Sequence, residues 1–290
     1  MGQFYLVQQV VGNELFVVDR FGQAKSYVVN SPWYQFLQYL ENYSQVFINS
    51  NTNTIGANDY LVLEPSFLVS VTATVEAISC PRKIYVKNQG AEKQRSREIL
   101  KKMTFGNLLH GVLSHRISFD TNIDDAIDAV VEKSKVELLT SNIIEKEAYS
   151  YLHGNSQIIN TLNIQGKTEL DSQNWQYGLS GKFDAITTNR IIEFKSSKIP
   201  DLHPWPDHNL QMITYIQMME DIQNYQGTVL YIHEGHMGMK RPTDWPIEET
   251  IRARNLAYLV YQGKLIPPVL RGDDKKICNS CFVKTGCYIL

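Results

Sequence analysis

The chain has 290 residues, enough to bury a full core in one large domain or in one domain with a smaller companion. Its net charge of −2 and pI of about 6.4 exclude a protein-wide basic field, so any nucleic-acid-binding surface must be local. The sequence has no run of about 18 apolar residues and no signal-peptide pattern, which excludes a membrane-embedded protein and predicts a soluble, cytoplasmic one.

The first 63 residues are predicted to form a small β-rich N-terminal module. Apolar and polar residues alternate over residues 2–20, and turn residues interrupt the alternation, which predicts antiparallel strands. Residues 33–47 place apolar side chains at helical spacing and predict a short helix. We expect a loop over residues 49–58, which are rich in Asn, Thr and Gly.

Residues 64–290 alternate between helical and strand periodicity, which predicts an α/β domain. In chain order we expect helices over 65–79, 104–118 and 124–140, strands over 158–168, 178–187 and 190–196, a helix over 207–221, a strand over 228–233 and a helix over 246–262.

A basic segment precedes the first of these long helices. Between Arg82 and Lys102 the sequence has eight basic residues and two acidic ones. Such a run is either a solvated face or a surface that contacts phosphates, and its position just before a candidate metal ligand favours the second interpretation.

Three of the four cysteines crowd together near the end of the sequence. Cys278, Cys281 and Cys287 have the spacing C-x2-C-x5-C, and Cys80 lies 198 positions upstream of the first. The C-x2-C spacing and the expected reducing compartment favour a shared metal centre over two disulfides. Four thiolates suit either zinc or an iron–sulfur cluster, so the metal stays open at this point.

Two acidic residues nine positions apart form the candidate catalytic pair. Asp184 ends the segment GKFD, and Glu193 lies in the segment IEFK, which Lys195 completes. If residues 187–190 form a turn, Asp184 and Glu193 lie on adjacent strands, and Glu193 and Lys195 point to one face. Two converging carboxylates suit a hard cation such as Mg²⁺ or Mn²⁺, although such a pair also occurs by chance in α/β proteins.

Three further residues are candidates for the same site. Gln211 and Tyr215 are four positions apart on an expected helix, so an amide and a phenol would project from one face. His110 lies beside an apolar helical stripe, where a histidine is more often a packed residue than a metal ligand. It is also a candidate nitrogen ligand to the metal.

Six sequence elements follow one another along residues 64–287: SCPR at 79–82, Gly106-x3-His110, Gly181-x2-Asp184, Glu193-x-Lys195, Gln211-x3-Tyr215 and the C-x2-C-x5-C run. This ordered set resembles the iron–sulfur-cluster branch of the RecB-like PD-(D/E)xK nucleases. That branch includes the CRISPR-associated adaptation exonucleases and the nuclease domain of the flap-processing nuclease–helicase. Phe183, not proline, precedes Asp184, a variation that such families tolerate.

The resemblance implies a fold, cofactors and residue roles. The fold would be a restriction-endonuclease-like α/β core with a mixed central sheet flanked by helices, spanning residues 64–290. The catalytic Mg²⁺ or Mn²⁺ would be held by His110, Asp184, Glu193 and the backbone carbonyl of Phe194. Lys195 would be the catalytic lysine, and Gln211 and Tyr215 would position DNA or the metal's surroundings. Cys80, Cys278, Cys281 and Cys287 would ligate a structural [4Fe–4S] cluster.

The leading functional prediction is therefore a metal-dependent DNA nuclease that prefers single-stranded DNA or DNA ends, acting as an exonuclease in repair, recombination or CRISPR adaptation. Tyr85, Phe105, Trp205 and Tyr215 are candidate base-stacking residues. A second prediction is a DNA-end-binding adaptor of a helicase or CRISPR integration complex with weak cleavage. A third is a zinc-stabilised nucleic-acid-binding protein in which the acidic pair is structural.

Overall fold

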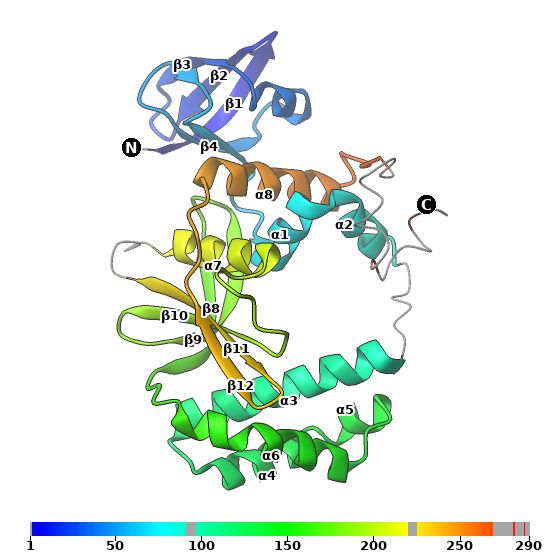
Figure 1. The fold of residues 1–290 in the computed structure, drawn as a ribbon. Helices are drawn as coiled ribbons and strands as arrows, with labels where there is room; N and C mark the ends of the chain where they lie inside the picture. Colours follow the sequence, from blue (N-terminus) through cyan, green and yellow to red (C-terminus); the bar gives the residue numbers. More distant parts are fainter. Residues whose placement is uncertain (1, 91–96, 220–224, 269–280, 282–286, 288–290) are drawn as a thin grey trace. The chain divides into compact units, whose positions relative to one another are not determined.

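The structure is a computed structural model that describes residues 2–90, 97–219 and 225–268, together with residues 281 and 287 (Figure 1). The chain divides into two compact units. The first unit comprises residues 1–93, 173–181 and 245–290, and the second comprises residues 94–172 and 182–244. The first unit is therefore assembled from three separate stretches of the chain.

A six-stranded sheet forms the N-terminal part of the first unit. Its strands, in the order β5-β3-β2-β1-β4-β6, are β1 (Gln3–Val11), β2 (Glu14–Asp19), β3 (Ala24–Val29), β4 (Gln45–Asn49), β5 (Thr54–Ile55) and β6 (Tyr60–Leu63). Alternate side chains of β1 and β2, such as Tyr5, Val7, Leu15 and Val17, are buried and form one inward face. The predicted β-rich N-terminal region is confirmed, whereas its boundary after residue 63 stays a prediction.

The helix predicted over residues 33–47 is wrong for most of its length. A short 3₁₀ helix, η1 (Tyr34–Tyr39), occupies its first half, and the last residues belong to β4. Val46, Phe47 and Ile48 are consecutive buried residues, and β4 pairs with both β1 and β6. A strand with neighbours on both edges favours such β-branched and aromatic residues, and this packing outweighs the helical spacing.

Three helices complete the described part of the first unit. They are α1 (Val71–Ser79), α2 (Pro81–Asn88) and α8 (Ile247–Tyr261), which lie together in Figure 1. The short strand β7 (Val69–Ser70) leads into α1, and the Ser70 hydroxyl accepts a hydrogen bond from the Ala73 amide at the helix start. Cys80 separates α1 from α2, which begins at a proline, so the cysteine is held between two fixed helix ends.

Arg254 on α8 is fully buried and binds the main chain around it. Its guanidinium donates to the carbonyls of Leu63, Glu64, Phe67 and Gly178. These carbonyls belong to the end of β6, to the segment after it and to the turn before β9. A single side chain therefore joins α8 to residues 63–67 and to the turn before β9, which are distant from one another in the sequence.

The second unit contains most of a mixed sheet in which β12 (His236–Lys240), β11 (Gln226–His233), β10 (Arg190–Lys195) and β9 (Leu179–Ile186) are neighbours in that order, and β8 (Lys167–Asn174) also pairs with β9. β10 and β11 are parallel, whereas β10 pairs with β9 and β11 pairs with β12 in the antiparallel direction. Ile192 and Phe194 of β10 face an apolar cluster that includes Leu109 and Val112 of α3 (Arg97–Phe119). Glu193 and Lys195 therefore face the other side of the strand, where α7 (Pro206–Met218) lies.

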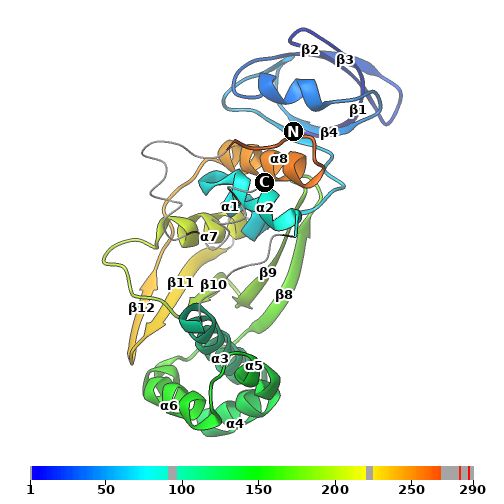
Figure 2. The same cartoon turned by 90° about the vertical axis from the view of Figure 1, so that its right-hand side faces the viewer.

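Four helices are grouped on the α3 side, as Figure 2 shows: α3, α4 (Ile123–Lys133), α5 (Lys135–Thr140) and α6 (Glu145–Thr161). The single helix predicted over residues 124–140 is two helices, because the chain turns at Ser134. The strand predicted to begin at residue 158 is also wrong. Residues 158–161 end α6, whose buried side chains Ala148, Leu152, Asn155 and Ile159 follow helical spacing, and β8 begins only at Lys167.

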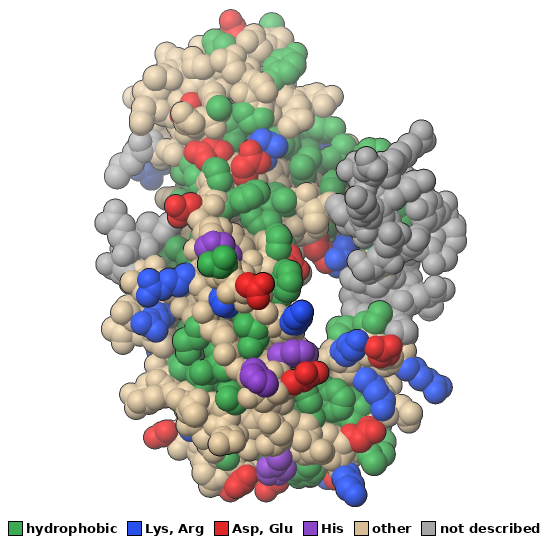
Figure 3. All heavy atoms as spheres, viewed as in Figure 1, with side chains coloured by type: hydrophobic (Ala, Val, Ile, Leu, Met, Phe, Trp, Pro, Cys, Tyr) green, Lys and Arg blue, Asp and Glu red, His purple; other side chains and the backbone are tan. Residues whose placement is uncertain are grey.

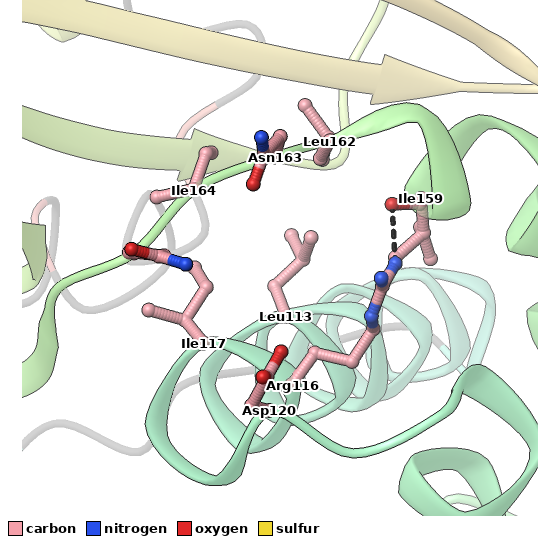
Figure 4. Close-up of a pocket in the computed structure, with 9 residues that line it drawn as sticks. Leu113, Arg116, Ile117, Asp120, Ile159, Leu162, Asn163 and Ile164 are labelled. Carbon is pink, nitrogen blue, oxygen red and sulfur yellow. Dashed lines mark hydrogen bonds between the residues drawn. The ribbon is translucent and has the colours of Figure 1, made fainter.

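The end of α6 is closed by a side chain from α3. The Arg116 guanidinium donates to the Ile159 carbonyl at 2.6 Å (Figure 4), and the same carbonyl accepts the amide hydrogen of the cap residue Leu162 at 3.1 Å. A pocket of about 60 Å³ lies here, lined by α3, the end of α6 and residues 162–165.

Within the described part of the chain, no helix combines the length and the hydropathy that a membrane crossing requires. The predicted mixed α/β fold with flanking helices is confirmed.

Candidate active site

The acidic pair lies where β9 and β10 begin to separate. Residues 187–190 form the turn, in which the Thr187 amide donates to the Arg190 carbonyl at 2.9 Å. Antiparallel pairing joins Ile186 to Ile191 and Ala185 to Ile192. Beyond these two pairs, the Phe194 amide donates to the Asp184 carboxylate, with 2.7 Å between Phe194 N and Asp184 Oδ2. Asp184 is thereby fixed by its side chain to the strand that carries Glu193.

His110 reaches the same acidic group from α3. Its Nδ1 lies 3.7 Å from Asp184 Oδ2, and its ring meets the Phe194 ring edge-on with 5.7 Å between centroids. Both the imidazole and the carboxylate are partly exposed. An oxygen donor and a nitrogen donor thus face one another with solvent access.

Glu193 is buried, with 4% of its surface exposed, and its carboxylate has two donors. Lys195 Nζ and Gln211 Nε2 each donate to Glu193 Oε1 at 2.7 Å. Burial raises the pKa of Glu193 to about 7, the charge of Lys195 opposes this rise, and the neighbouring Asp184 adds to it. The positive charge present in the site therefore compensates only in part for removing this carboxylate from water.

Helix α7 supplies the second layer of contacts. Lys195 Nζ also donates to Gln211 Oε1 at 2.9 Å, so the Gln211 amide holds both the lysine and Glu193. Tyr215, one turn later, donates its hydroxyl hydrogen to the Lys182 carbonyl at 2.9 Å, and its ring packs edge-on against Phe183. Gln211 and Tyr215 project together, as residues four apart on a helix do.

This donor set fits a hard divalent cation. Asp184 and Glu193 provide carboxylate oxygens, His110 provides a nitrogen 3.7 Å from Asp184, and the raised pKa of Glu193 marks a place where added positive charge would be stabilising. The side chains are not closed around a common point: among the described residues, no group of three or more His, Cys, Asp or Glu is arranged to hold a metal ion.

The cysteines belong to the first unit. Cys80, Cys281 and Cys287 are half-buried free thiols, whereas Cys278 lies outside the described residues. Burial raises the pKa of Cys80, and the thiols of Cys281 and Cys287 raise it further, so both thiols lie within electrostatic reach of Cys80. The Arg82 guanidinium donates to the Pro267 carbonyl at 2.9 Å and to the Cys287 carbonyl at 3.5 Å.

The described part of the basic segment is largely engaged with the protein itself. Arg82 is buried, and Lys83 and Lys87 both pair with Glu76. Lys101 and Lys102 form ion pairs with Glu147 and Glu98, respectively. Figure 3 likewise shows basic and acidic side chains intermingled on the face that it presents. The segment therefore contributes to folding as well as to surface charge.

Of the four candidate stacking residues, Trp205 is the most open. Its side chain is 42% exposed, and the ring is held by a hydrogen bond of 2.9 Å from Nε1 to the Lys198 carbonyl. Tyr215 is buried in the site, Phe105 packs against Tyr151, and Tyr85 lies beneath Arg82. Trp205 immediately precedes α7, the helix that carries Gln211.

Sequence reasoning missed one group beside this site. His208 on α7 and Tyr231 on β11 share a hydrogen bond of 2.9 Å, and the Trp205 amide donates to the Tyr231 hydroxyl at 3.2 Å. Burial lowers the pKa of His208 to about 4, with a smaller effect from the nearby Lys195 charge. The only available signal was the position of His208 three residues before Gln211.

Comparisons with known proteins point to one family. The family model described as DNA replication factor Dna2 matches residues 18–174, a stretch that includes Cys80 and His110 and ends before Asp184. The chain is 21% identical to the DNA replication ATP-dependent helicase/nuclease DNA2 of Saccharomyces cerevisiae, over 94% of this chain and 22% of that protein. It is 23% identical to the helicase/nuclease JHS1 of Arabidopsis thaliana, over 85% of this chain and 23% of that protein.

The chain thus spans less than a quarter of the length of either relative. Among solved structures, the crystal structure of SSO0001 aligns with 62% of this chain and 82% of its own, at 20% identity and a TM-score of 0.29.

Proposed function

The chain belongs to the family of the DNA replication factor Dna2, and we propose that it is a metal-dependent deoxyribonuclease whose site is formed by Asp184, Glu193 and Lys195. The observation that carries the proposal is the buried Glu193 carboxylate, held by Lys195 and Gln211 beside a second carboxylate. Two relatives named as helicase/nucleases support hydrolysis of DNA.

Each residue of the proposed site has a role that follows from its position. His110, Asp184, Glu193 and the Phe194 carbonyl would hold Mg²⁺ or Mn²⁺, which when bound lowers the pKa of a water molecule and neutralises phosphate charge. The Phe194 amide keeps Asp184 in place, and Gln211 keeps the Lys195 ammonium beside Glu193. From there Lys195 orients the attacking water or stabilises the charge that develops on the phosphoryl oxygens. Tyr215 anchors the main chain at Lys182, two residues before Asp184.

Cleavage of end-labelled single-stranded and duplex DNA with Mg²⁺ or Mn²⁺ tests the proposal. In Lys195→Ala we expect the cleavage rate to fall by about a hundredfold to a thousandfold, because a preorganised electrostatic group is lost. Glu193→Gln should lower the rate of metal-dependent cleavage by at least as much as Lys195→Ala. Lys133→Ala, which removes an exposed lysine on α4, serves as the matched control.

The outcome is decisive in both directions. Loss of cleavage in both site variants, with the control active and all three folded, supports the site. A folded, metal-supplied wild-type chain that binds DNA but leaves it uncut would overturn the nuclease proposal.

A preference for single strands and attack from an end belong to the same proposal. The exposed and fixed ring of Trp205 beside α7 supports the first, because unpaired bases stack on such platforms. The product ladder of the labelled substrates separates exonucleolytic from endonucleolytic cutting. A helicase or a CRISPR integration complex is the proposed partner.

We further propose that Cys80, Cys278, Cys281 and Cys287 hold a structural [4Fe–4S] cluster. The effect of the Cys281 and Cys287 thiols on the pKa of Cys80 supports this, since four neighbouring thiolates suit such a cluster. Anaerobically purified protein should then contain iron and absorb broadly in the visible range, and Cys281→Ser should lose both signals. Stoichiometric zinc without iron would instead identify a zinc site.

The alternative function is a DNA-end-binding adaptor with weak cleavage. The exposed apolar side chains of the N-terminal sheet, Phe4, Leu6 and Val28, favour it because they offer a surface for a partner. DNA binding without cleavage in the experiment above is the result that this alternative predicts.

A further inference from the structure

The Lys182 side chain is a cation beside the acidic pair, and it has no role in the proposed site. It lies on β9 two residues before Asp184, and its side chain is 52% exposed. Its main chain is fixed because the Tyr215 hydroxyl donates to its carbonyl at 2.9 Å. The ammonium is thus carried by an anchored backbone yet remains open to solvent.

The partner of Lys182 is Glu169 on β8. The two side chains form an ion pair, and Glu169 is also partly exposed. Glu169 adopts a φ of 56°, a left-handed conformation that is uncommon for a residue with a side chain. Its other carboxylate oxygen accepts a hydrogen bond of 3.4 Å from the hydroxyl of Ser114 on α3.

Two neighbouring sets of side-chain contacts therefore connect α3 to β9. His110 approaches Asp184, and Ser114, four residues later on the same helix face, reaches Lys182 through Glu169. Lys182 and Asp184 are two residues apart on β9, so their side chains leave the same face of the strand roughly 7 Å apart. A strand of nucleic acid whose cleaved phosphate occupies the acidic pair would bring a neighbouring phosphate to this lysine.

An ion pair between two exposed side chains contributes little to stability. The gain in stability from the pair with Lys182 therefore does not by itself explain the strained backbone of Glu169. A phosphate competes well with such a carboxylate, because lysine binds phosphate as a point charge and its stem is flexible.

We propose that Lys182 binds a backbone phosphate adjacent to the cleaved one, and that Glu169 holds the lysine in position until DNA displaces it. This inference rests on the proposed nuclease function, and it adds a positioning residue to that site. Lys182 takes no part in bond cleavage; it sets where along the strand the scissile phosphate lies.

The test measures binding, so that cleavage does not interfere. All proteins in this test carry Glu193→Gln. Each is titrated into a fluorescein-labelled single-stranded oligonucleotide at several salt concentrations, and binding is followed by fluorescence anisotropy. One lost phosphate contact should lower the slope of log K against log salt by about 0.7, and we expect this change in Lys182→Ala. Lys182→Arg should keep the slope, and the control Lys133→Ala should not alter it.

Glu169→Gln supplies the opposite expectation. Removal of the competing carboxylate frees the lysine, so binding should tighten by about twofold to fivefold, the factor that corresponds to an exposed ion pair. A role confined to structure would move neither the salt slope nor the affinity in this direction.

An unchanged slope in a folded Lys182→Ala variant, while the background chain still binds DNA, overturns the role of Lys182 and leaves the nuclease proposal intact. Failure of the nuclease proposal appears in a different measurement, as the absence of metal-dependent cleavage by the wild-type chain.

Discussion

Two buried charged groups in this protein have opposite surroundings. Arg254 in the first unit is fully buried, and its guanidinium is surrounded by main-chain carbonyls. Glu193 in the second unit is almost as buried, but one of its carboxylate oxygens accepts both of its side-chain hydrogen bonds.

Their pKa values express the difference. Burial lowers the pKa of Arg254 to about 9, so the group stays charged at neutral pH, whereas burial raises the pKa of Glu193 to about 7. A buried charge that is saturated with hydrogen bonds is part of the fold, because its removal leaves the buried partners unpaired. A buried charge that is not saturated is available for a ligand, and perturbed groups of this kind cluster at functional sites.

The largest expected effect is on stability, through Arg254→Met. The carbonyls of Leu63, Glu64 and Phe67 would lose their buried donor, and we expect unfolding in urea to show a loss of about 3–5 kcal/mol. Arg254→Lys should recover little of this, because an ammonium cannot reproduce the planar fork. A loss below about 1 kcal/mol would contradict the comparison, because it would show that the buried hydrogen bonds of Arg254 matter little for stability.

A smaller effect should follow from His208, a buried group that is neutral. Burial, helped by the Lys195 charge, lowers the pKa of His208 from 6.5 to about 4. Between these values the unfolded chain binds a proton that the folded chain does not, so stability rises with pH through this window and is lost as the pH falls. The full effect is about 3 kcal/mol.

Denaturant unfolding at pH values from about 4 to about 7 measures this change. His208→Gln should flatten the pH dependence, and His236→Gln, at an exposed position, should leave it unchanged. Identical pH profiles for wild type and His208→Gln would show that His208 titrates as an exposed histidine does.

The smallest effect concerns the open side of the site, at Trp205. Loss of a stacking ring costs about 1–3 kcal/mol per base, so Trp205→Ala should weaken single-strand binding by about fivefold to a hundredfold. Duplex binding should change little. Trp175→Ala removes a tryptophan that is 54% exposed in the first unit and is the matched control. Equal losses in the two variants would argue against a specific platform at Trp205.

Part of the second unit was predictable because β10 and β11 contain short apolar runs with clear ends, whereas β8 is a polar strand. The segment around Ile191, Ile192 and Phe194 predicts a buried strand, and the alternation predicts that Glu193 and Lys195 share a face. The structure brings His110, Asp184, Glu193, Lys195, Gln211 and Tyr215 together within one unit, and their catalytic roles stay predictions.

The errors have a common cause, which is that tertiary contacts decided the outcome. Residues 45–49 became a central strand because β1 and β6 pair with it on both sides. Arg82 counts as surface charge in the sequence, yet it is buried against main-chain carbonyls near the C-terminal cysteines. His208 and Tyr231 lie on different elements, and no local pattern reports that they meet.

The three-part construction of the first unit determines the order in which the chain can fold. Asn255 donates from its side chain to the Leu61 carbonyl across 194 residues of sequence, and Arg254 reaches Leu63 across 191. During synthesis these two carbonyls therefore lack their α8 donors until the second unit and then α8 have emerged from the ribosome. Contacts of such long range form slowly. A ribosome stalled before residue 247 would hold a nascent chain whose second unit has its whole sequence while its first unit lacks α8.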